Sequence, residues 1–278
     1  MNDKTDANIC PIGIFDSGLG GLCAVREALD ALPGEHIIYF GDSGRVPYGS
    51  RSYDTIQKYA RQAINFLVAK GVKIILVACG TVSSVALDYL RGAFPALPII
   101  GVVEPACEKA VKIARETSNN KIGVIGTQAT IAKGAYTKYI AGLGHNFEVY
   151  GKACPLFVTL VENGHIDSDP ITKLAAEYYL AEFRDLHLGS LVLGCTHYPF
   201  IKNTIGEIVE TELIDVGAEA VHRLAGEIEA RKLANSPGKK GALEVYISDE
   251  TQGFSRIASN FLGFDIGDSV KKIDIEKF

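Results

Sequence analysis

The sequence lacks the features of a secreted or membrane-spanning protein. Its apolar stretches fall well short of the roughly 20 residues that cross a bilayer. The polar start, Met1–Asn8, has no apolar signal-peptide core. Six cysteines are present, and without a secretion signal we expect them to be free thiols rather than disulfides. These observations predict a cytoplasmic protein.

Signatures of metal, cofactor and nucleic-acid binding are missing as well. The cysteines and histidines show none of the spacings of a zinc site, and no pyridoxal motif is evident. The net charge is −5 and no stripe of Lys and Arg stands out, which argues against nucleic acid as the main partner. We therefore expect a chain that needs no cofactor or metal and binds neither nucleic acid nor a membrane.

What is present is the patterning of an α/β protein. Hydrophobic residues make up 47% of the 278 residues and charged residues 22%, which is ordinary for a globular chain. Apolar strand-like runs alternate with helical patterns, as is typical of mostly parallel sheets flanked by helices. The predicted strands are 12–15, 37–40, 74–78, 99–103, 122–125, 191–193 and 243–247, and the predicted helices are 22–32, 56–67, 172–183 and 216–229.

The chain contains an internal repeat. Residues 12–17 resemble 122–127, and residues 77–81 resemble 193–197 at a nearly equal offset. The simplest explanation is two related, pseudosymmetric α/β domains that share a cleft, with the C-terminal residues packing back onto the first domain. The predicted domains are 1–100 together with 212–278, and 101–211.

Cys79 and Cys195 stand at matching places in this repeat. Each follows an apolar run that predicts a buried strand, and hydroxyl residues that could begin a helix come next. A thiol there lies at the sheet edge where α/β proteins bind ligands, and a helix N-terminus lowers the thiol pKa from about 8.5. One buried cysteine is usually inert, but two in equivalent places indicate opposed acid and base groups on one substrate carbon. Such a pair suits racemisation or epimerisation.

Further polar residues lie near the same strand ends. The glycine-rich segment Asp16–Gly21 follows the first strand, and a buried carboxylate at position 16 needs a partner or a task. The loop Pro47–Gly49 follows the second strand. His197 comes shortly after Cys195, and Glu162 is a candidate to orient it. Taken singly, these features are explained as well by a tight turn, a structural histidine and a solvated carboxylate.

Together these motifs resemble those of the cofactor-independent glutamate racemases. The resemblance is carried, in order and along nearly the whole chain, by Asp16–Gly21, Pro47–Gly49, Ala78–Thr81 and Gly194–Pro199. It implies two pseudosymmetric α/β domains with the active site in the cleft between them. It also implies the interconversion of L- and D-glutamate. This reaction supplies D-glutamate for the synthesis of peptidoglycan, which forms the cell wall and maintains cell shape. Glutamate is then the expected small-molecule partner, and a second copy of the chain in a homodimer is compatible with the family.

The resemblance also implies roles for individual residues. Cys79 would take the proton from D-glutamate and Cys195 from L-glutamate. Asp16 and His197 would support the respective thiols, with Glu162 near His197. The family most often has Asn where this chain has Gly80, whose amide remains available. The residues implied to hold the substrate are Asp16, Ser17, Pro47, Tyr48, Gly49, Gly80, Thr81, Thr127, Thr196 and His197.

Four alternatives stay open. An aspartate racemase of the same superfamily usually carries Glu after the second Gly-Cys-Thr and lacks the Asp-Ser-Gly segment, so His197 and Asp16 favour glutamate. A decarboxylase relative would need only one of the two cysteines. A non-catalytic amino-acid-binding protein would need neither, and a redox protein would join Cys79 and Cys195 in a disulfide.

Overall fold

The structure, a computed structural model, describes residues 10–235, 241–250 and 254–278. The polar segment Met1–Asn8 lies outside the described residues. Within the described ranges, every helix is too short or too polar to span a bilayer.

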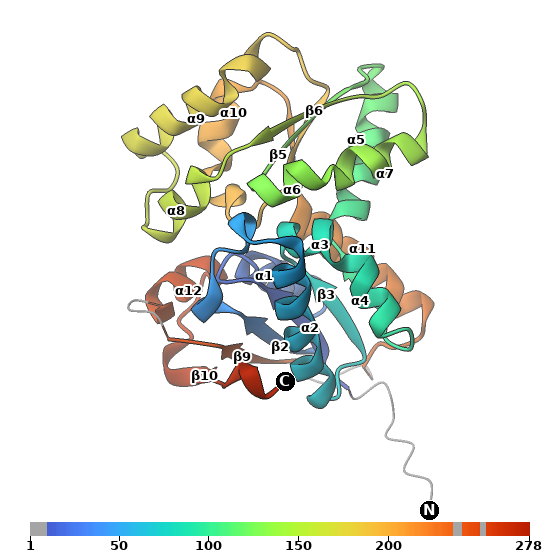
Figure 1. The fold of residues 1–278 in the computed structure, drawn as a ribbon, viewed down its shortest axis with the longest axis vertical. Coiled ribbons are helices and arrows are strands. Elements are labelled where there is room, and N and C mark those ends of the chain that lie inside the picture. The colour runs from blue at the N-terminus through green and yellow to red at the C-terminus, as the bar shows by residue number, and fades with distance from the viewer. Residues whose placement is uncertain (1–9, 236–240, 251–253) are drawn as a thin grey trace, which may run out of the picture.

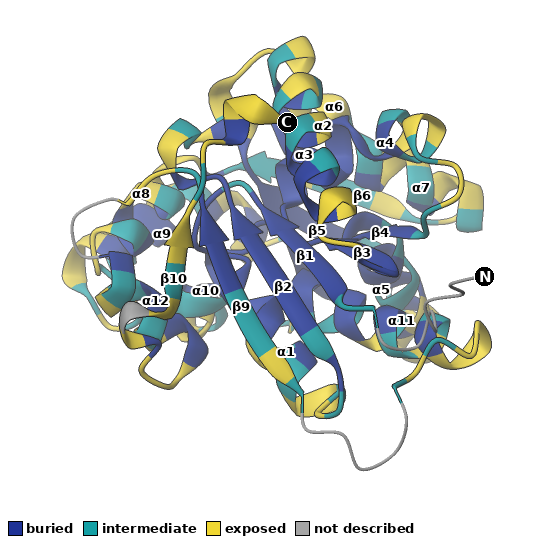
Figure 2. Ribbon diagram, turned by 90° about the horizontal axis from the view of Figure 1, so that it is seen from below, coloured by how far each residue is buried: buried dark blue, intermediate teal, exposed yellow. Residues whose placement is uncertain are grey.

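The first sheet has six parallel strands in the order β10-β9-β2-β1-β3-β4. Figure 2 shows these strands side by side, with β1 and β2 buried along their length. Two of the strands come from the C-terminal part of the chain, which returns to this sheet. The strands are β1 (Ile12–Asp16), β2 (His36–Gly41), β3 (Ile74–Val77), β4 (Ile99–Gly101), β9 (Ala242–Ile247) and β10 (Val270–Lys272).

The second sheet repeats the order of the first. Its four parallel strands run β6-β5-β7-β8, which matches β2-β1-β3-β4 strand for strand. They are β5 (Lys121–Gly126), β6 (Glu148–Ala153), β7 (Ser190–Leu193) and β8 (Glu212–Asp215). The predicted α/β class with parallel sheets is therefore confirmed. Because β8 pairs with β7, this sheet ends at Asp215, just beyond the predicted boundary at 212. The division of the chain into domains stays a prediction.

Helices cover both sheets (Figure 1). α1, α2, α3, α4 and α12 lie on the first sheet, which forms the first half of the molecule. α5 to α10 lie on the second sheet and form the second half, and α11 packs against both α1 and α5. The helices are α1 (Leu22–Ala31), α2 (Tyr53–Ala69), α3 (Gly80–Val85), α4 (Leu87–Ala93), α5 (Val103–Thr117), α6 (Gln128–Lys133), α7 (Ala135–Leu143), α8 (Leu156–Glu162), α9 (Pro170–Arg184), α10 (Lys202–Ile208), α11 (Val216–Ala230) and α12 (Phe254–Leu262).

Local sequence signals explain where the clearest helices begin. Ser52 caps α2 by accepting a hydrogen bond from the Thr55 backbone N–H at 3.3 Å. Asp169 caps α9 in the same way, and Pro170 occupies the first turn, where no N–H is needed. The apolar face of α2 is then buried against the sheet.

The strands that sequence reasoning missed are exposed or short. β6 and β8 lie at the edges of the second sheet and have partly exposed side chains, and β10 is a three-residue edge strand. None therefore presents a continuous apolar run. The predicted strand 99–103 is shorter than expected because α5 begins at Val103.

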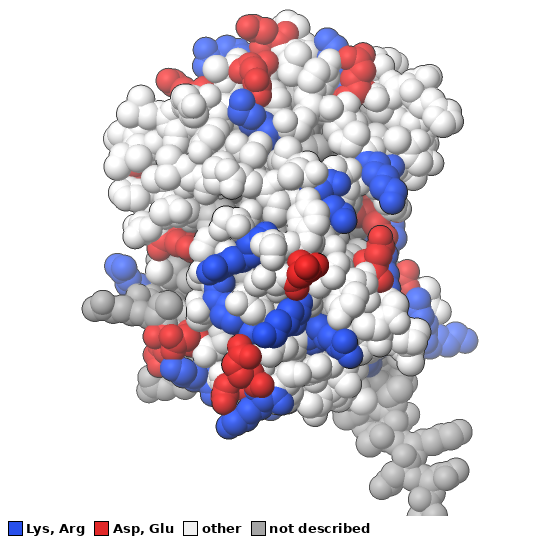
Figure 3. Space-filling model, viewed as in Figure 1, with Lys and Arg blue, Asp and Glu red and all other residues white. Residues whose placement is uncertain are grey.

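Charges of both signs are mixed on the surface. On the face drawn in Figure 3, Lys and Arg side chains gather over the first half, with Asp and Glu side chains among them. Neither sign covers the whole face.

A buried ion pair fixes the segment after α11 to the start of the first sheet. Lys73 Nζ donates to Glu35 Oε2 at 2.6 Å and to the Leu233 carbonyl at 2.6 Å. The other oxygen of Glu35 accepts from the Asn235 backbone N–H at 2.8 Å. Both charged side chains are at most 5% exposed, so removing one would leave the other buried and unpaired.

We expect Lys73→Met to lower the free energy of unfolding by about 3–5 kcal/mol, because Glu35 would keep a buried charge without its partner. Chemical denaturation measures this change. The control is Lys112→Met, which removes an exposed i,i+4 pair with Glu116 and should change stability by less than about 0.5 kcal/mol. Equal effects of the two substitutions would contradict the prediction.

Candidate active site

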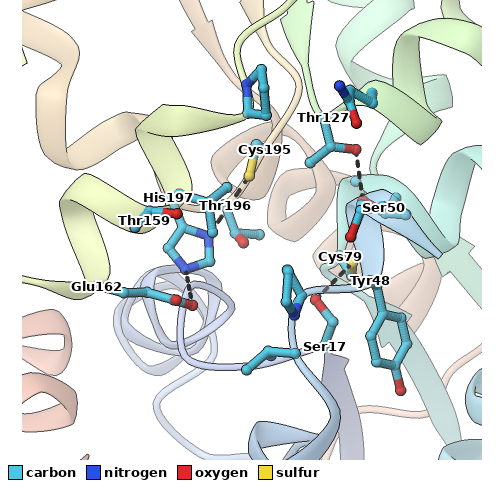
Figure 4. Close-up of a pocket in the computed structure, with 18 residues that line it drawn as sticks. Ser17, Tyr48, Ser50, Cys79, Thr127, Thr159, Glu162, Cys195, Thr196 and His197 are labelled. Carbon is cyan, nitrogen blue, oxygen red and sulfur yellow. Dashed lines mark hydrogen bonds and ion pairs between the residues drawn. The ribbon is translucent and has the colours of Figure 1, made fainter. Parts of the chain in front are cut away.

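The carboxyl ends of the two sheets face one cavity of about 160 Å³. Both halves contribute to its wall, and Figure 4 shows Cys79 and Cys195 on opposite sides of it. Every predicted site residue except Asp16 lines the cavity. The structure thus brings the predicted residues together, while their chemical roles stay predictions.

Cys79 follows the end of β3 by two residues and stands just before α3. Its Sγ donates a hydrogen bond to Ser17 Oγ at 3.2 Å, and its side chain is almost fully buried. Burial, followed by the charge of Asp16, raises the pKa of this thiol to about 12. The prediction of a lowered pKa is therefore wrong for Cys79: the backbone N–H of Val82 in the first turn of α3 does lower the pKa, but the loss of water outweighs it. Cys79 holds its proton at neutral pH.

Cys195 follows the β7 strand in the second half. Its Sγ lies 3.7 Å from His197 Nδ1. The helix predicted to begin directly after Cys195 is wrong: a 3-10 helix, Tyr198–Ile201, comes first, and α10 follows it. Pro199 explains the difference, because it has no N–H to donate to the Cys195 carbonyl, which accepts from Tyr198 N–H at 3.1 Å instead.

His197 lies between Cys195 and Glu162. Its Nε2 lies 3.2 Å from Glu162 Oε1, on the side of the ring away from the thiol (Figure 4). Burial alone would lower the pKa of His197, but the hydrogen bonds to Cys195 and Glu162 outweigh it and raise the pKa to about 10. The imidazole is therefore a cation at neutral pH, and it stands beside one of the two thiols only.

Asp16 connects the two halves and makes no hydrogen bond to Cys79. Its carboxylate is fully buried and accepts from the Gly18 backbone N–H at 2.9 Å and from Thr196 Oγ1 at 3.4 Å. Burial raises its pKa, opposed first by the charge of His197. Asp16 therefore acts on Cys79 through its charge alone, and Ser17 makes the direct contact.

Hydroxyl groups from both halves meet on the other side of the cavity. Thr81 Oγ1 and Thr127 Oγ1 are 3.0 Å apart and share a hydrogen bond. Thr127 also caps α6 by accepting from the Thr130 backbone N–H at 3.3 Å. This contact joins the first turns of α3 and α6, one from each half.

Tyr48, which the resemblance implies to hold the substrate, directs its phenol away from the cavity. Its OH donates to Asp42, which is fully buried and also bound by Arg45 at 2.8 Å. Figure 4 shows the ring directed away from the two thiols. The Pro47–Gly49 loop therefore offers its backbone and the proline ring to a ligand.

Sequence reasoning missed several lining residues. They are Val46, Ser50, Gln128, Pro155, Val158 and Thr159. Val158 and Thr159 precede Glu162 by four and three positions on α8, so helical spacing from Glu162 is the signal that would have found them.

Gly80 lines the cavity, and the space beside it is already filled. A Cβ on Gly80 would overlap the carbonyl oxygen of Gly194 in the second half. A side chain at this position would therefore need the two backbones to lie farther apart.

Known racemases resemble the chain over most of its length. The sequence profile of the family described as Asp/Glu/Hydantoin racemase matches residues 22–224. A glutamate racemase from Chlorobaculum tepidum is 47% identical over 260 residues, which are 93% of this chain and 94% of that protein. A glutamate racemase from Geobacter metallireducens is 40% identical over 267 residues, 95% of this chain and 97% of its own.

A solved structure is similar to this chain in both fold and sequence. The crystal structure of glutamate racemase from Francisella tularensis in complex with D-glutamate matches with a TM-score of 0.90 at 37% identity. It covers 98% of this chain and 100% of its own.

The imidazolium of His197 makes stability depend on pH. Its folded-state pKa of about 10 lies above the value of about 6.5 expected in an unfolded chain. The resulting stabilisation is complete below about pH 6.5 and is lost as the pH rises to about 10. Glu162→Gln removes the negative charge beside Nε2 while it keeps an acceptor oxygen, so we expect a lower pKa of His197 and a smaller loss of stability over this range.

NMR titration of the imidazole and chemical denaturation across the same pH range measure the two effects. Glu177→Gln, which removes an exposed carboxylate on α9, is the control and should leave both unchanged. The prediction is contradicted if the pKa of His197 is the same in Glu162→Gln as in the parent chain.

Proposed function

Because this chain belongs to the Asp/Glu/hydantoin racemase family, we propose that Cys79 and Cys195 interconvert L- and D-glutamate as opposed acid and base groups. The observation that carries the proposal is the placement of two buried thiols on opposite walls of one cavity, one from each half. Each follows the third strand of its sheet repeat, so the repeated fold supplies both groups. The substrate α-carbon lies between them.

The reaction moves one proton off the α-carbon and puts another back on the opposite face. With L-glutamate, the Cys195 thiolate takes the α-proton and the C–H electron pair stays on carbon as a carbanion. The Cys79 thiol then donates its proton, which forms the new C–H bond and leaves a Cys79 thiolate. D-glutamate reacts by the same steps in reverse.

The unequal surroundings of the two thiols support this order of events. The raised pKa of Cys79 keeps on its sulfur the proton that must be donated. His197, charged and held by Glu162, places a cation beside Cys195. The two thiols therefore have unequal surroundings, which suits a two-base reaction that starts with one thiol and one thiolate.

The polar lining of the cavity suits a small amino acid. Hydroxyl groups of Ser17, Thr81, Thr127 and Thr196 face it from both halves, together with the backbone of Gly80 and of the Pro47–Gly49 loop. These groups hold the ammonium and carboxylate groups and stabilise the charge that develops on the substrate.

The cellular role follows from the product. D-glutamate made by this reaction is used for peptidoglycan. All six cysteines are free, as a thiol-dependent enzyme requires, and a reducing compartment such as the cytoplasm keeps them so. A homodimer is the proposed assembly, and the exposed apolar residues Ile171, Leu174 and Tyr178 on one side of α9 support it. Sedimentation velocity measures the mass of the assembly and so tests for a dimer.

We expect both Cys79→Ser and Cys195→Ser to abolish racemisation, because each removes one of the two proton carriers. Proton NMR in heavy water, without added cofactor, follows the α-proton of L-glutamate, D-glutamate and L-aspartate. The parent chain should replace the glutamate α-proton by deuterium and form the other enantiomer. Because a hydroxyl is far less acidic than a thiol, we expect the rate of racemisation to fall at least about 1000-fold in each variant.

Cys10→Ser is the matched control. Because Cys10 lies outside the cavity, this substitution should leave the rate of racemisation unchanged. Exchange on aspartate alone would assign the chain to aspartate racemisation. Full activity of either active-site variant would rule out the two-thiol mechanism.

A further inference from the structure

The contact between Glu162 and His197 joins the ends of two elements of the second half. Glu162 is the last residue of α8, and His197 comes directly before the 3-10 helix Tyr198–Ile201. The side chain of Glu162 is 29% exposed, so packing around it fixes its position only in part. The geometry of this contact therefore depends on how the segment that follows Glu162 is attached to the segment that follows His197.

Asp167 attaches these two segments to each other. It lies five positions after Glu162, and its backbone N–H donates to the carbonyl oxygen of Phe200 at 3.1 Å. Its two carboxylate oxygens accept from the backbone N–H groups of Asn203 at 3.3 Å and of Thr204 at 2.9 Å. These N–H groups belong to the first turn of α10, where the helix itself offers them no acceptor. The side chain of Asp167 thus caps a helix that begins in the segment after His197.

A further hydrogen bond and a strained residue belong to the same attachment. The backbone N–H of Ser168 donates to Thr204 Oγ1 at 3.3 Å, and Thr204 is buried. Ser168 has φ 68°, in the left-handed region that is unfavourable for residues other than glycine. Asp169 then begins α9 as its N-cap. Contacts with α9 and α10 therefore hold the loop in a conformation that it would not adopt by itself.

The start of α8 is held to the same 3-10 helix by a separate contact. The rings of Phe157 and Tyr198 meet edge to face, with their centroids 5.3 Å apart, and both side chains are fully buried. Glu162 lies at the opposite end of α8. Figure 1 shows α8, α9 and α10 together in the second half. Asp167 therefore provides the attachment at the end of α8 that carries the carboxylate.

We propose that Asp167 is a positioning residue that holds the Glu162 carboxylate against the His197 ring beside Cys195. The inference rests on the two-thiol racemase function proposed above, and it extends that function to a residue outside the cavity. A misplacement of about 1 Å can cost about 100-fold in rate. Because Asp167 acts through Glu162 and His197, we expect its loss to cost less than that.

Loss of Asp167 should affect the site through the charge of His197. Glu162 faces the ring on one side and Cys195 on the other, and the charge of Asp16 also acts on it. A carboxylate that moves away stabilises the imidazolium less, so the pKa of His197 falls. The cation beside Cys195 is then lost at a lower pH, and the alkaline decline of the racemisation rate should begin at a lower pH as well.

The experiment compares Asp167→Ala, Glu162→Gln and the variant with both changes, using L- and D-glutamate. We expect kcat of Asp167→Ala to fall about 10-fold with KM changing less, since the lost contacts lie outside the cavity. NMR titration should show a lowered pKa of His197, as in Glu162→Gln. Because both changes weaken one contact, Asp167→Ala should lower kcat by less than about 2-fold when Glu162→Gln is already present.

Asp215→Ala is the matched control. Asp215 accepts from the backbone N–H groups of Gly217 and Ala218 in the first turn of α11, so its loss also removes a helix cap, and it lies outside the cavity. This variant should keep the parent kcat and the parent pKa of His197. Asp167→Asn, which keeps one acceptor oxygen, should show the same changes as Asp167→Ala to a smaller extent, and it replaces the alanine variant if thermal unfolding shows that the latter does not fold.

Two results would overturn the proposal. One is a folded Asp167→Ala protein with the parent kcat or the parent pKa of His197. The other is a set of independent, multiplicative effects of Asp167→Ala and Glu162→Gln on kcat, as a general loss of structure would give. A parent chain that does not racemise glutamate would reject the proposed function, and an unchanged pKa of His197 in Asp167→Ala would still overturn the positioning role by itself.

Discussion

The close approach of the two sheet ends is the constraint on which the rest of the site depends. Backbone meets backbone at Gly80 and Gly194, and the small cavity exists because the halves come this near. That same nearness removes water from the Cys79 thiol and from the His197 ring, and it lets Thr196 of one half reach Asp16 of the other. A looser junction would leave each cysteine as an ordinary thiol at the end of a strand.

A repeated fold here produces unequal chemistry. The strand order of the second sheet copies that of the first, and the cysteines follow equivalent strands. Their neighbours differ: Cys79 has the neutral hydroxyl of Ser17 and the nearby charge of Asp16, whereas Cys195 has His197. Because burial magnifies the effect of a single charged neighbour, a few substitutions between the repeats are enough to make one thiol hold its proton and to put a cation beside the other.

Sequence reasoning succeeded where the signal is local. Buried central strands such as β1 and β3 are continuous apolar runs, and the two cysteine motifs follow them directly. It failed where the outcome depends on distant packing. The edge strand β6 has no apolar run, and the Tyr48 phenol binds Asp42 rather than a ligand. The contact between Gly80 and Gly194 joins segments far apart in the chain, and nothing in either segment alone predicts that the halves meet there.

The chemistry gives a reason why the two halves meet so closely at the cavity. A single base needs to reach its substrate from one side only, so a gap of an ångström on the far side costs little. Two bases acting on opposite faces of one carbon must both be within reach during the same short lifetime of a carbanion. Their separation is then limited by the backbones that carry them, which meet at Gly80 and Gly194. The close approach of the two halves is part of the two-base site as much as the thiols are.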